Sequence, residues 1–173
     1  MAAQQHNPVA GEDPAWKKHD HKACIDQAVQ DAEAICRRRG VRLTPVRKRV
    51  LRLIWSNHQP VGAYALLDMY RDYEPSAAPP TVYRALGFLM EQGLVHRIAS
   101  QNAFVGCAHP TENHQGQFLI CRSCGAASEL HSDRAVQALT DDARALGFEI
   151  EHPTIELSGL CPQCQRLPQA RQP

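Results

Sequence analysis

The 173-residue sequence predicts an α+β protein in two parts, a helical part that ends in a β-hairpin and a smaller α/β part that follows it. In the first part, apolar residues recur at helical spacing as far as residue 92, and two short strand-like runs come next. The second part holds two Cys-x-x-Cys motifs, which enclose a strand, a helix and a further strand. The length fits one domain or two small ones.

Four helices are predicted in the first part from their apolar periodicity and their end signals. Gly40 and Gly93 are typical helix stops. Thr44 is a preferred N-cap residue, and Pro45 suits the first turn that follows it. The four helices are expected at residues 24–39, from 45 up to the 59–62 segment, at 63–73 and at 78–92.

A β-hairpin is predicted after the helices. Residues 94–98 and 103–106 are expected to be its strands, and residues 100–102 its turn. Helices followed by such a hairpin form a winged helix, a variant of the helix-turn-helix fold. We therefore expect an N-terminal winged helix-turn-helix domain at residues 23–106, preceded by a mobile polar tail at residues 1–22.

A small α/β domain is predicted at residues 116–165, between a hinge or linker at 107–115 and a tail at 166–173. Gly147 is the expected stop of its helix. The elements of this domain are expected to be a strand at 117–120, a short strand reaching Leu130, a helix from Ser132 or Asp133 to Leu146, and a strand at 148–157.

The net charge of +1 hides an asymmetry between the two halves. Residues 22–97 hold 12 Lys and Arg against 7 Asp and Glu, whereas residues 98–173 hold 5 against 8. A basic first half indicates that only this half meets a polyanion such as nucleic acid, although an excess of this size also occurs on ordinary surfaces.

Neither a membrane span nor a secretion signal is expected. The sequence has no run of about 18 apolar residues, and its N-terminus lacks the apolar region of a signal peptide. We therefore expect a cytoplasmic protein, in which clustered cysteines more often hold metal or do redox chemistry than form disulfides. Seven cysteines and nine histidines supply many possible ligands.

The paired Cys-x-x-Cys motifs predict a structural zinc site. Each pair can turn both sulfur atoms towards one point, and two pairs complete a tetrahedron. Gly125 suits the tight turn after the first pair. A redox pair and four unrelated thiols are the alternatives, but nothing thioredoxin-like surrounds either motif. A closed site of this kind contributes folding energy and no catalysis. Its expected ligands are Cys121, Cys124, Cys161 and Cys164.

Three motifs in order carry a resemblance to a known family. They are Arg42-Leu43-Thr44-Pro45-x-Arg47, Pro80-Thr81-Val82-Tyr83-Arg84-Ala85-Leu86, and the two cysteine pairs with Gly125. Over about residues 24–165 the chain resembles the ferric uptake regulator family, and within it the zinc uptake regulator (Zur) branch. The resemblance implies a homodimer with an N-terminal winged helix and a C-terminal α/β dimerisation domain. It also implies metal-dependent binding to AT-rich palindromic operator DNA, and no enzymatic activity.

The same resemblance implies which residues contact DNA. Arg84 lies on the implied recognition helix and is the best candidate for a base contact, because arginine pairs bidentately with guanine. Taken without the family pattern, Arg84 reads as a solvated arginine of a helix face. Basic residues around the second helix suit phosphate contacts, which position the protein without specifying sequence. The expected DNA-contacting residues are Tyr64, Thr81, Tyr83, Arg84, Arg42, Arg47 and Lys48.

A metal-dependent repressor needs a second, exchangeable metal site near the hinge. The expected ligands of this sensing site come from both halves and match the composition that the Zur branch implies: His96, Cys107, His114 and Glu129. Taken singly, each has a simpler interpretation, such as a buried strand thiol for Cys107 or a surface carboxylate for Glu129. His109, His131 and His152 are reserve ligands, and Glu112 could compete with Glu129.

The donor set favours zinc as the sensed metal, with two zinc ions per chain in total. A thiolate among nitrogen and oxygen donors favours zinc over ferrous iron or manganese. The dense His-His-Asp-His stretch typical of iron-sensing members is missing before the first cysteine pair, where residues 114–118 read His-Gln-Gly-Gln-Phe. We therefore predict a zinc-responsive repressor of zinc-uptake genes.

Three other functions stay open at this point. The nearest is an iron- or peroxide-responsive regulator of the same family. A zinc hydrolase or deaminase would need an open metal position and a general base, and the deaminase H-x-E signature is absent. A zinc protein that only assembles partners would not need the basic Arg47-Lys48-Arg49 face.

Overall fold

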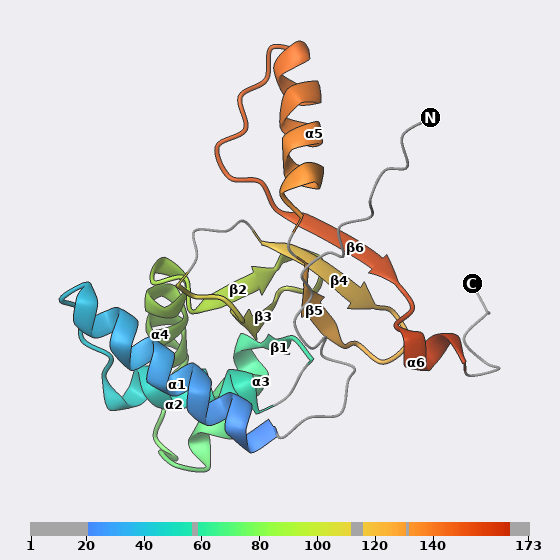
Figure 1. The fold of residues 1–173 in the computed structure, drawn as a ribbon. Helices are drawn as coiled ribbons and strands as arrows, with labels where there is room; N and C mark the ends of the chain where they lie inside the picture. The colour runs from blue at the N-terminus through green and yellow to red at the C-terminus, as the bar shows by residue number, and fades with distance from the viewer. Residues whose placement is uncertain (1–20, 57–58, 112–115, 131, 167–173) are drawn as a thin grey trace.

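The computed structural model describes residues 21–56, 59–111, 116–130 and 132–166 (Figure 1). Most of both predicted tails and part of the predicted linker lie outside these residues. Among the described helices, none is long and apolar enough to span a membrane.

The N-terminal half has the predicted winged-helix architecture. Thr44 caps the second helix as expected, because its side chain accepts a hydrogen bond from the backbone N–H of Arg47. The helices are α1 (His21–Arg38), α2 (Pro45–Trp55), α3 (Ala63–Arg71) and α4 (Pro79–Glu91). An antiparallel sheet of order β1-β3-β2 is formed by β1 (Val61–Gly62), β2 (Val95–Ile98) and β3 (Ala103–Gly106).

One apolar core unites the four helices and the β-hairpin. It is built from the helix faces that the periodicity predicted, and its largest fully buried side chains include Ile35, Leu51, Leu66, Leu86 and Val95. Burial of such side chains is the main favourable term in folding. The core therefore fixes α4 against α2 and the hairpin.

The C-terminal half is a three-stranded sheet with two helices at its ends. The sheet order is β5-β4-β6, with β4 antiparallel to β5 and parallel to β6. Gly125 has the positive φ of +75° that the turn after the first cysteine pair was predicted to need. The elements are β4 (Gln117–Cys121), β5 (Ala127–Glu129), α5 (Asp133–Ala145), β6 (Ile155–Gly159) and α6 (Pro162–Gln165).

The strand predicted at residues 148–157 is wrong in its first part. The structure begins this strand at Ile155 and continues it to Gly159. Residues 148–154 are irregular, because pairing with β4 starts only at Ile155. An extended segment without a neighbouring strand leaves its backbone groups unpaired, so it does not form a ladder.

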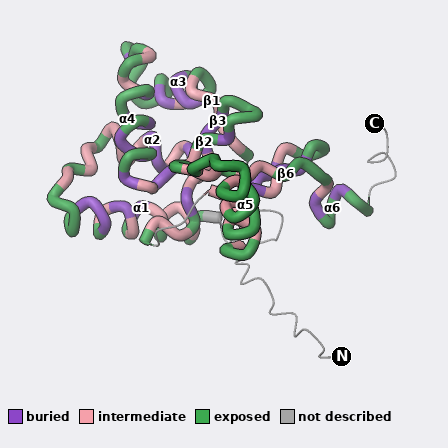
Figure 2. Tube along the Cα trace, turned by 90° about the horizontal axis from the view of Figure 1, so that it is seen from above, coloured by how far each residue is buried: buried purple, intermediate pink, exposed green. Residues whose placement is uncertain are grey.

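Helix α5 extends away from the sheet and contributes no buried residue (Figures 1 and 2). It is nevertheless amphipathic in sequence, and Leu139, Leu146 and the following Phe148 are exposed. Large apolar side chains gathered on one surface are typical of an interaction site.

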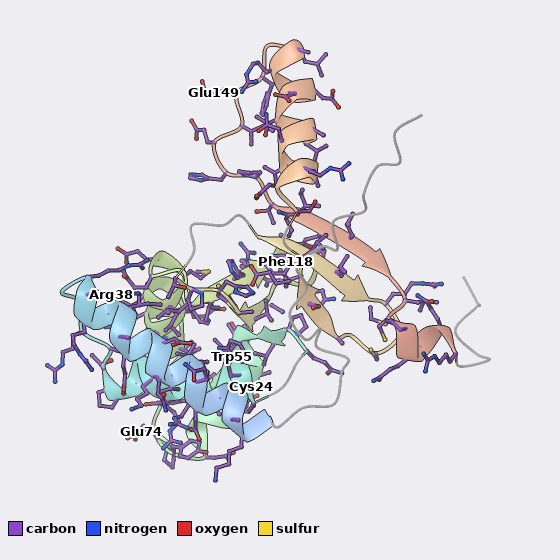
Figure 3. The ribbon with its side chains drawn as sticks, viewed as in Figure 1. Cys24, Arg38, Trp55, Glu74, Phe118 and Glu149 are labelled. Carbon is purple, nitrogen blue, oxygen red and sulfur yellow. The ribbon has the colours of Figure 1, made fainter. Side chains whose placement is uncertain are left out.

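The two halves meet through a second, smaller core. Ile98 of β2 and Val105 of β3 pack against Phe118, Ile120 and Ala127 of the C-terminal sheet. Phe118, labelled in Figure 3, lies where the two sheets come together. This junction brings the wing hairpin against one face of the C-terminal sheet.

Candidate metal centres and nucleic-acid interface

The four cysteines of the two Cys-x-x-Cys motifs lie together at the end of the C-terminal sheet. Their sulfur atoms all lie within 4.8 Å of one another, and Cys124 Sγ is 3.9 Å from Cys161 Sγ. Tetrahedral zinc with Zn–S bonds of about 2.3 Å holds its sulfur atoms roughly 3.8 Å apart. The spacing and the donor chemistry therefore fit a zinc ion bound by Cys121, Cys124, Cys161 and Cys164.

Backbone amides prepare one of these thiols for metal binding. Cys121 ends β4, and its Sγ accepts a hydrogen bond from the backbone N–H of Cys161 at 3.3 Å. Burial opposes ionisation, but backbone N–H groups of Cys161, Cys124 and Ser123 outweigh it and lower the pKa of Cys121 to about 6. Zinc binds the thiolate form, so this arrangement favours metal binding.

A second cluster joins the wing to the C-terminal sheet. His96 lies on β2, Cys107 directly follows β3, and Glu129 ends β5. Their ligand atoms lie within 4.8 Å of one another, and His96 Nε2 is 3.2 Å from Glu129 Oε1. Nitrogen and oxygen ligands of tetrahedral zinc lie roughly 3.4 Å apart. Imidazole, thiol and carboxylate at this spacing therefore fit one zinc ion.

The second cluster is sheltered and oriented by its surroundings. The side chains of His96 and Glu129 are 18% and 6% exposed, and Cys107 is 2% exposed. Glu129 Oε2 accepts a hydrogen bond from the backbone N–H of Ala108 at 3.3 Å. The Phe118 ring lies 5.4 Å from the His96 ring, centroid to centroid. Contacts of this kind hold ligands in place before metal arrives.

The structure brings three of the four predicted sensing ligands together. His114, His131 and Glu112 lie outside the described residues, so their predicted roles stay predictions. His109 and His152 belong to neither of the two ligand clusters found among the described residues. Their predicted reserve role therefore gains no support.

The residues predicted to contact DNA divide into an exposed group and a half-buried group. Tyr64 at the start of α3 is 70% exposed, and Tyr83 on α4 is 49% exposed. Arg84, also exposed on α4, donates from Nε to the carbonyl of Pro80 at 3.2 Å. Arg42 is exposed as well, and Thr81 is half-buried in the first turn of α4. The start of α4 is therefore exposed to solvent.

Arg47 and Lys48, predicted to contact phosphate, already have partners inside the N-terminal half. The guanidinium of Arg47 lies 3.5 Å from the centre of the Phe88 ring and donates to the Arg42 carbonyl. Lys48 forms an ion pair with Glu33 of α1. The contact with Phe88 was not predicted, because no local spacing relates residues that far apart in sequence. Their phosphate contacts stay predictions.

Comparison with known proteins agrees with this architecture. The model of the ferric uptake regulator family matches residues 38–158. The zinc uptake regulation protein of Escherichia coli (strain K12) is 42% identical over 155 residues, covering 88% of this chain and 90% of that protein. A more distant relative, the ferric uptake regulation protein of Brucella abortus, is 32% identical over 73% of this chain and 89% of its own length.

Solved structures are similar over most of the chain. A zinc uptake regulator complexed with zinc and DNA has a TM-score of 0.78 at 42% identity, covering 82% of this chain and 95% of its own. Holo XcZur has a TM-score of 0.76 at 48% identity and 82% and 99% coverage. Apo XcZur has a TM-score of only 0.50 at 46% identity and 83% and 99% coverage. With the family model matching over residues 38–158 and relatives this similar, the chain belongs to the ferric uptake regulator family, as its motifs predicted.

Proposed function

We propose that the chain is a zinc-responsive transcriptional repressor of zinc-uptake genes. It binds palindromic operator DNA as a homodimer when its second metal cluster holds zinc. The observation that carries this proposal is the cluster of His96, Cys107 and Glu129, whose ligands come from both halves of the chain. Its similarity to zinc uptake regulation proteins supports the same function, and its relatives of this family are regulators rather than enzymes.

The proposed control of DNA binding by metal rests on the position of the second cluster. His96 and Cys107 belong to the wing side and Glu129 to the C-terminal sheet, so one ion held by all three fixes the winged helix relative to the sheet. We call this fixed arrangement of the two halves the closed arrangement. Metal binding then favours it over the other arrangements in equilibrium with it. The higher TM-score against holo than against apo XcZur supports this interpretation, because the arrangement described here is nearer the holo one.

Two zinc ions per chain have separate roles in this proposal. The four-cysteine site has no open coordination position and stabilises the C-terminal half. The second cluster would be completed by His114, the fourth predicted ligand. The thiol of Cys107 favours zinc over ferrous iron and manganese as the signal.

The exposed side of α5 supports the homodimer. Leu139 on α5, and Leu146 and Phe148 just after it, are large apolar side chains that are at least half exposed among the described residues. A second copy would bury them in a self-complementary interface. Two recognition helices in one dimer suit a palindromic operator, and such a repressor acts in the cytoplasm.

Metal analysis beside an operator titration tests the proposal. The purified protein should contain two zinc ions per chain, and fluorescence anisotropy should detect tight binding to a palindromic promoter fragment of a zinc-uptake gene only with zinc. Ferrous iron and manganese serve as controls. Binding that requires iron or manganese instead would identify the chain as a regulator that responds to that metal. Binding without metal dependence would refute the proposal.

A further inference from the structure

Three residues form one row across the C-terminal sheet. In the register of the strands, Phe118 of β4 is paired with Glu129 of β5 on one side and with Glu156 of β6 on the other. Directly paired residues of a sheet lie on the same face. Glu129, Phe118 and Glu156 therefore form a transverse row, which spans about 10 Å at the usual strand spacing.

Each member of the transverse row contacts the wing. Glu129 lies beside His96, and Phe118 packs against the same imidazole ring. At the other end of the row, Glu156 accepts hydrogen bonds from two consecutive backbone N–H groups of the turn between β2 and β3. The Ala99 nitrogen is 2.6 Å from Oε1, and the Ser100 nitrogen is 3.1 Å from Oε2.

We propose that Glu156 is a positioning residue: its hydrogen bonds to the wing turn favour the closed arrangement of the two halves and thereby set the zinc concentration at which the chain becomes able to bind DNA. The inference rests on the proposed function, since it concerns how easily the two halves close. Glu156 belongs to neither ligand cluster among the described residues, so its effect is separate from metal coordination.

The chemistry of the contact requires a carboxylate. Both oxygens of Glu156 accept, one from each N–H, and charge-assisted bonds of this type are stronger than neutral ones. Burial opposes the charge, yet hydrogen bonds from Ser100 and Ala99 keep the pKa of Glu156 below its usual range. A glutamine could accept through one oxygen only, and its NH₂ group would face the second donor.

Linkage gives this role a distinctive signature. The docking stabilises the closed arrangement with and without zinc, and the apparent affinity for zinc scales with the closed fraction. Losing the docking therefore raises the zinc concentration needed for half-maximal operator binding. Saturating zinc restores the closed form, so the final operator affinity changes little. A DNA contact would behave in the opposite way, because its loss lowers the final affinity.

The experiment compares wild type with Glu156→Gln and Glu156→Ala in zinc buffered by a chelator. Operator binding is followed by anisotropy, and exchange of the Ala99 and Ser100 amides is followed by NMR without DNA. Glu151→Gln is the matched control, since Glu151 is an exposed carboxylate five residues earlier on the same segment. Zinc content and thermal melting establish that each variant is folded, and the near-isosteric glutamine variant guards against misfolding of the alanine variant.

We expect both Glu156 variants to need at least about fivefold more free zinc at half-maximal binding. Their final operator affinity should stay within about twofold of wild type, and their Ala99 and Ser100 amides should exchange faster. A zinc midpoint equal to that of wild type overturns the inference, whatever the final affinity. If wild type itself shows no zinc-dependent operator binding, the proposed function fails, and the zinc titration of amide exchange then decides the docking by itself.

Discussion

At the scale of single residues, the second metal cluster depends on groups that are costly to bury without a partner. Cys107 is almost fully buried, and its backbone N–H donates to the Leu94 carbonyl at 3.1 Å. A neutral thiol tolerates such a place, but a thiolate requires a cation beside it. A bound metal ion would therefore supply the partner that a Cys107 thiolate needs at this buried place.

Replacing Cys107 by serine should remove the sensing zinc and leave the fold. The hydroxyl is nearly the same size but a poor zinc ligand at neutral pH. We expect the zinc content to fall from two to one per chain and zinc-dependent operator binding to be lost. Cys24→Ser, a half-buried cysteine outside both clusters, is the control. Metal analysis that still finds two zinc ions in Cys107→Ser would assign the site to other ligands.

Gly106, the residue before Cys107, has no room for a side chain. A Cβ atom there would lie 2.2 Å from two atoms of the Trp55 indole. The Gly106→Ala variant should therefore be destabilised by about 1–3 kcal/mol, because the indole must move. Urea denaturation of the zinc-loaded protein, followed by Trp fluorescence, measures this loss.

Gly87 provides the matched control for this substitution. A Cβ atom at Gly87, on α4, would meet nothing within 4 Å. Because alanine is the better helix former, Gly87→Ala should gain about 0.5–1 kcal/mol. Equal stability of the two alanine variants would contradict the packing of Trp55 over Gly106.

At the scale of elements, the sequence predicted best where the determining signals are local. The adjacent residues Thr44 and Pro45 mark the start of α2. Gly40 and Gly93, which both have a positive φ, each follow the end of a helix. By contrast, β1 has only two residues and exists through its pairing with β3. The strand expected from residue 148 had the composition of a strand but no neighbouring strand in the same chain.

The site divides in the same way. The cysteine pairs predicted their own cluster from spacing, while His96, Cys107 and Glu129 could be chosen only through the family resemblance. Glu156 was missed, because a carboxylate on β6 becomes informative only when its donors in the wing turn are known. Long-range contacts of this kind leave no periodic signal in the sequence.

Helix α5 should hold the dimer through its apolar side. The Leu139→Glu variant places a charge where a second copy would bury leucine, so it should shift the protein from dimer to monomer. Sedimentation velocity measures the change. Arg134→Glu introduces the same residue at an exposed position in the first turn and should stay dimeric. A monomeric wild type, or an unaffected Leu139→Glu dimer, would exclude this surface as the interface.

At the scale of the whole molecule, the two halves contact each other at several separate points, and the second metal cluster is only one of them. Gln59 donates to the carbonyl of Cys124 at 2.6 Å, next to the four-cysteine cluster. Glu156 holds the wing turn, and the second cluster joins the halves at a third place. In the proposed mechanism, these polar contacts orient the closed arrangement, and metal binding at the second cluster adds the free energy that makes it dominant.

Removing only the sensing zinc should therefore open the molecule. A mild chelator takes the ion from the second cluster, while the four-cysteine site keeps its zinc because four thiolates hold it and three of the cysteines, Cys121, Cys161 and Cys164, are buried. We expect small-angle X-ray scattering to show a larger radius of gyration after this treatment and recovery on adding zinc.

The Cys107→Ser variant should stay in the expanded form at any zinc level. The reasons are that His96 and Glu129 alone supply too few ligands to bridge the halves, and that the contacts of Gln59 and Glu156 are too weak to close them. Identical scattering with and without the sensing zinc would mean that the halves are already fixed, and that zinc acts on DNA binding by another route.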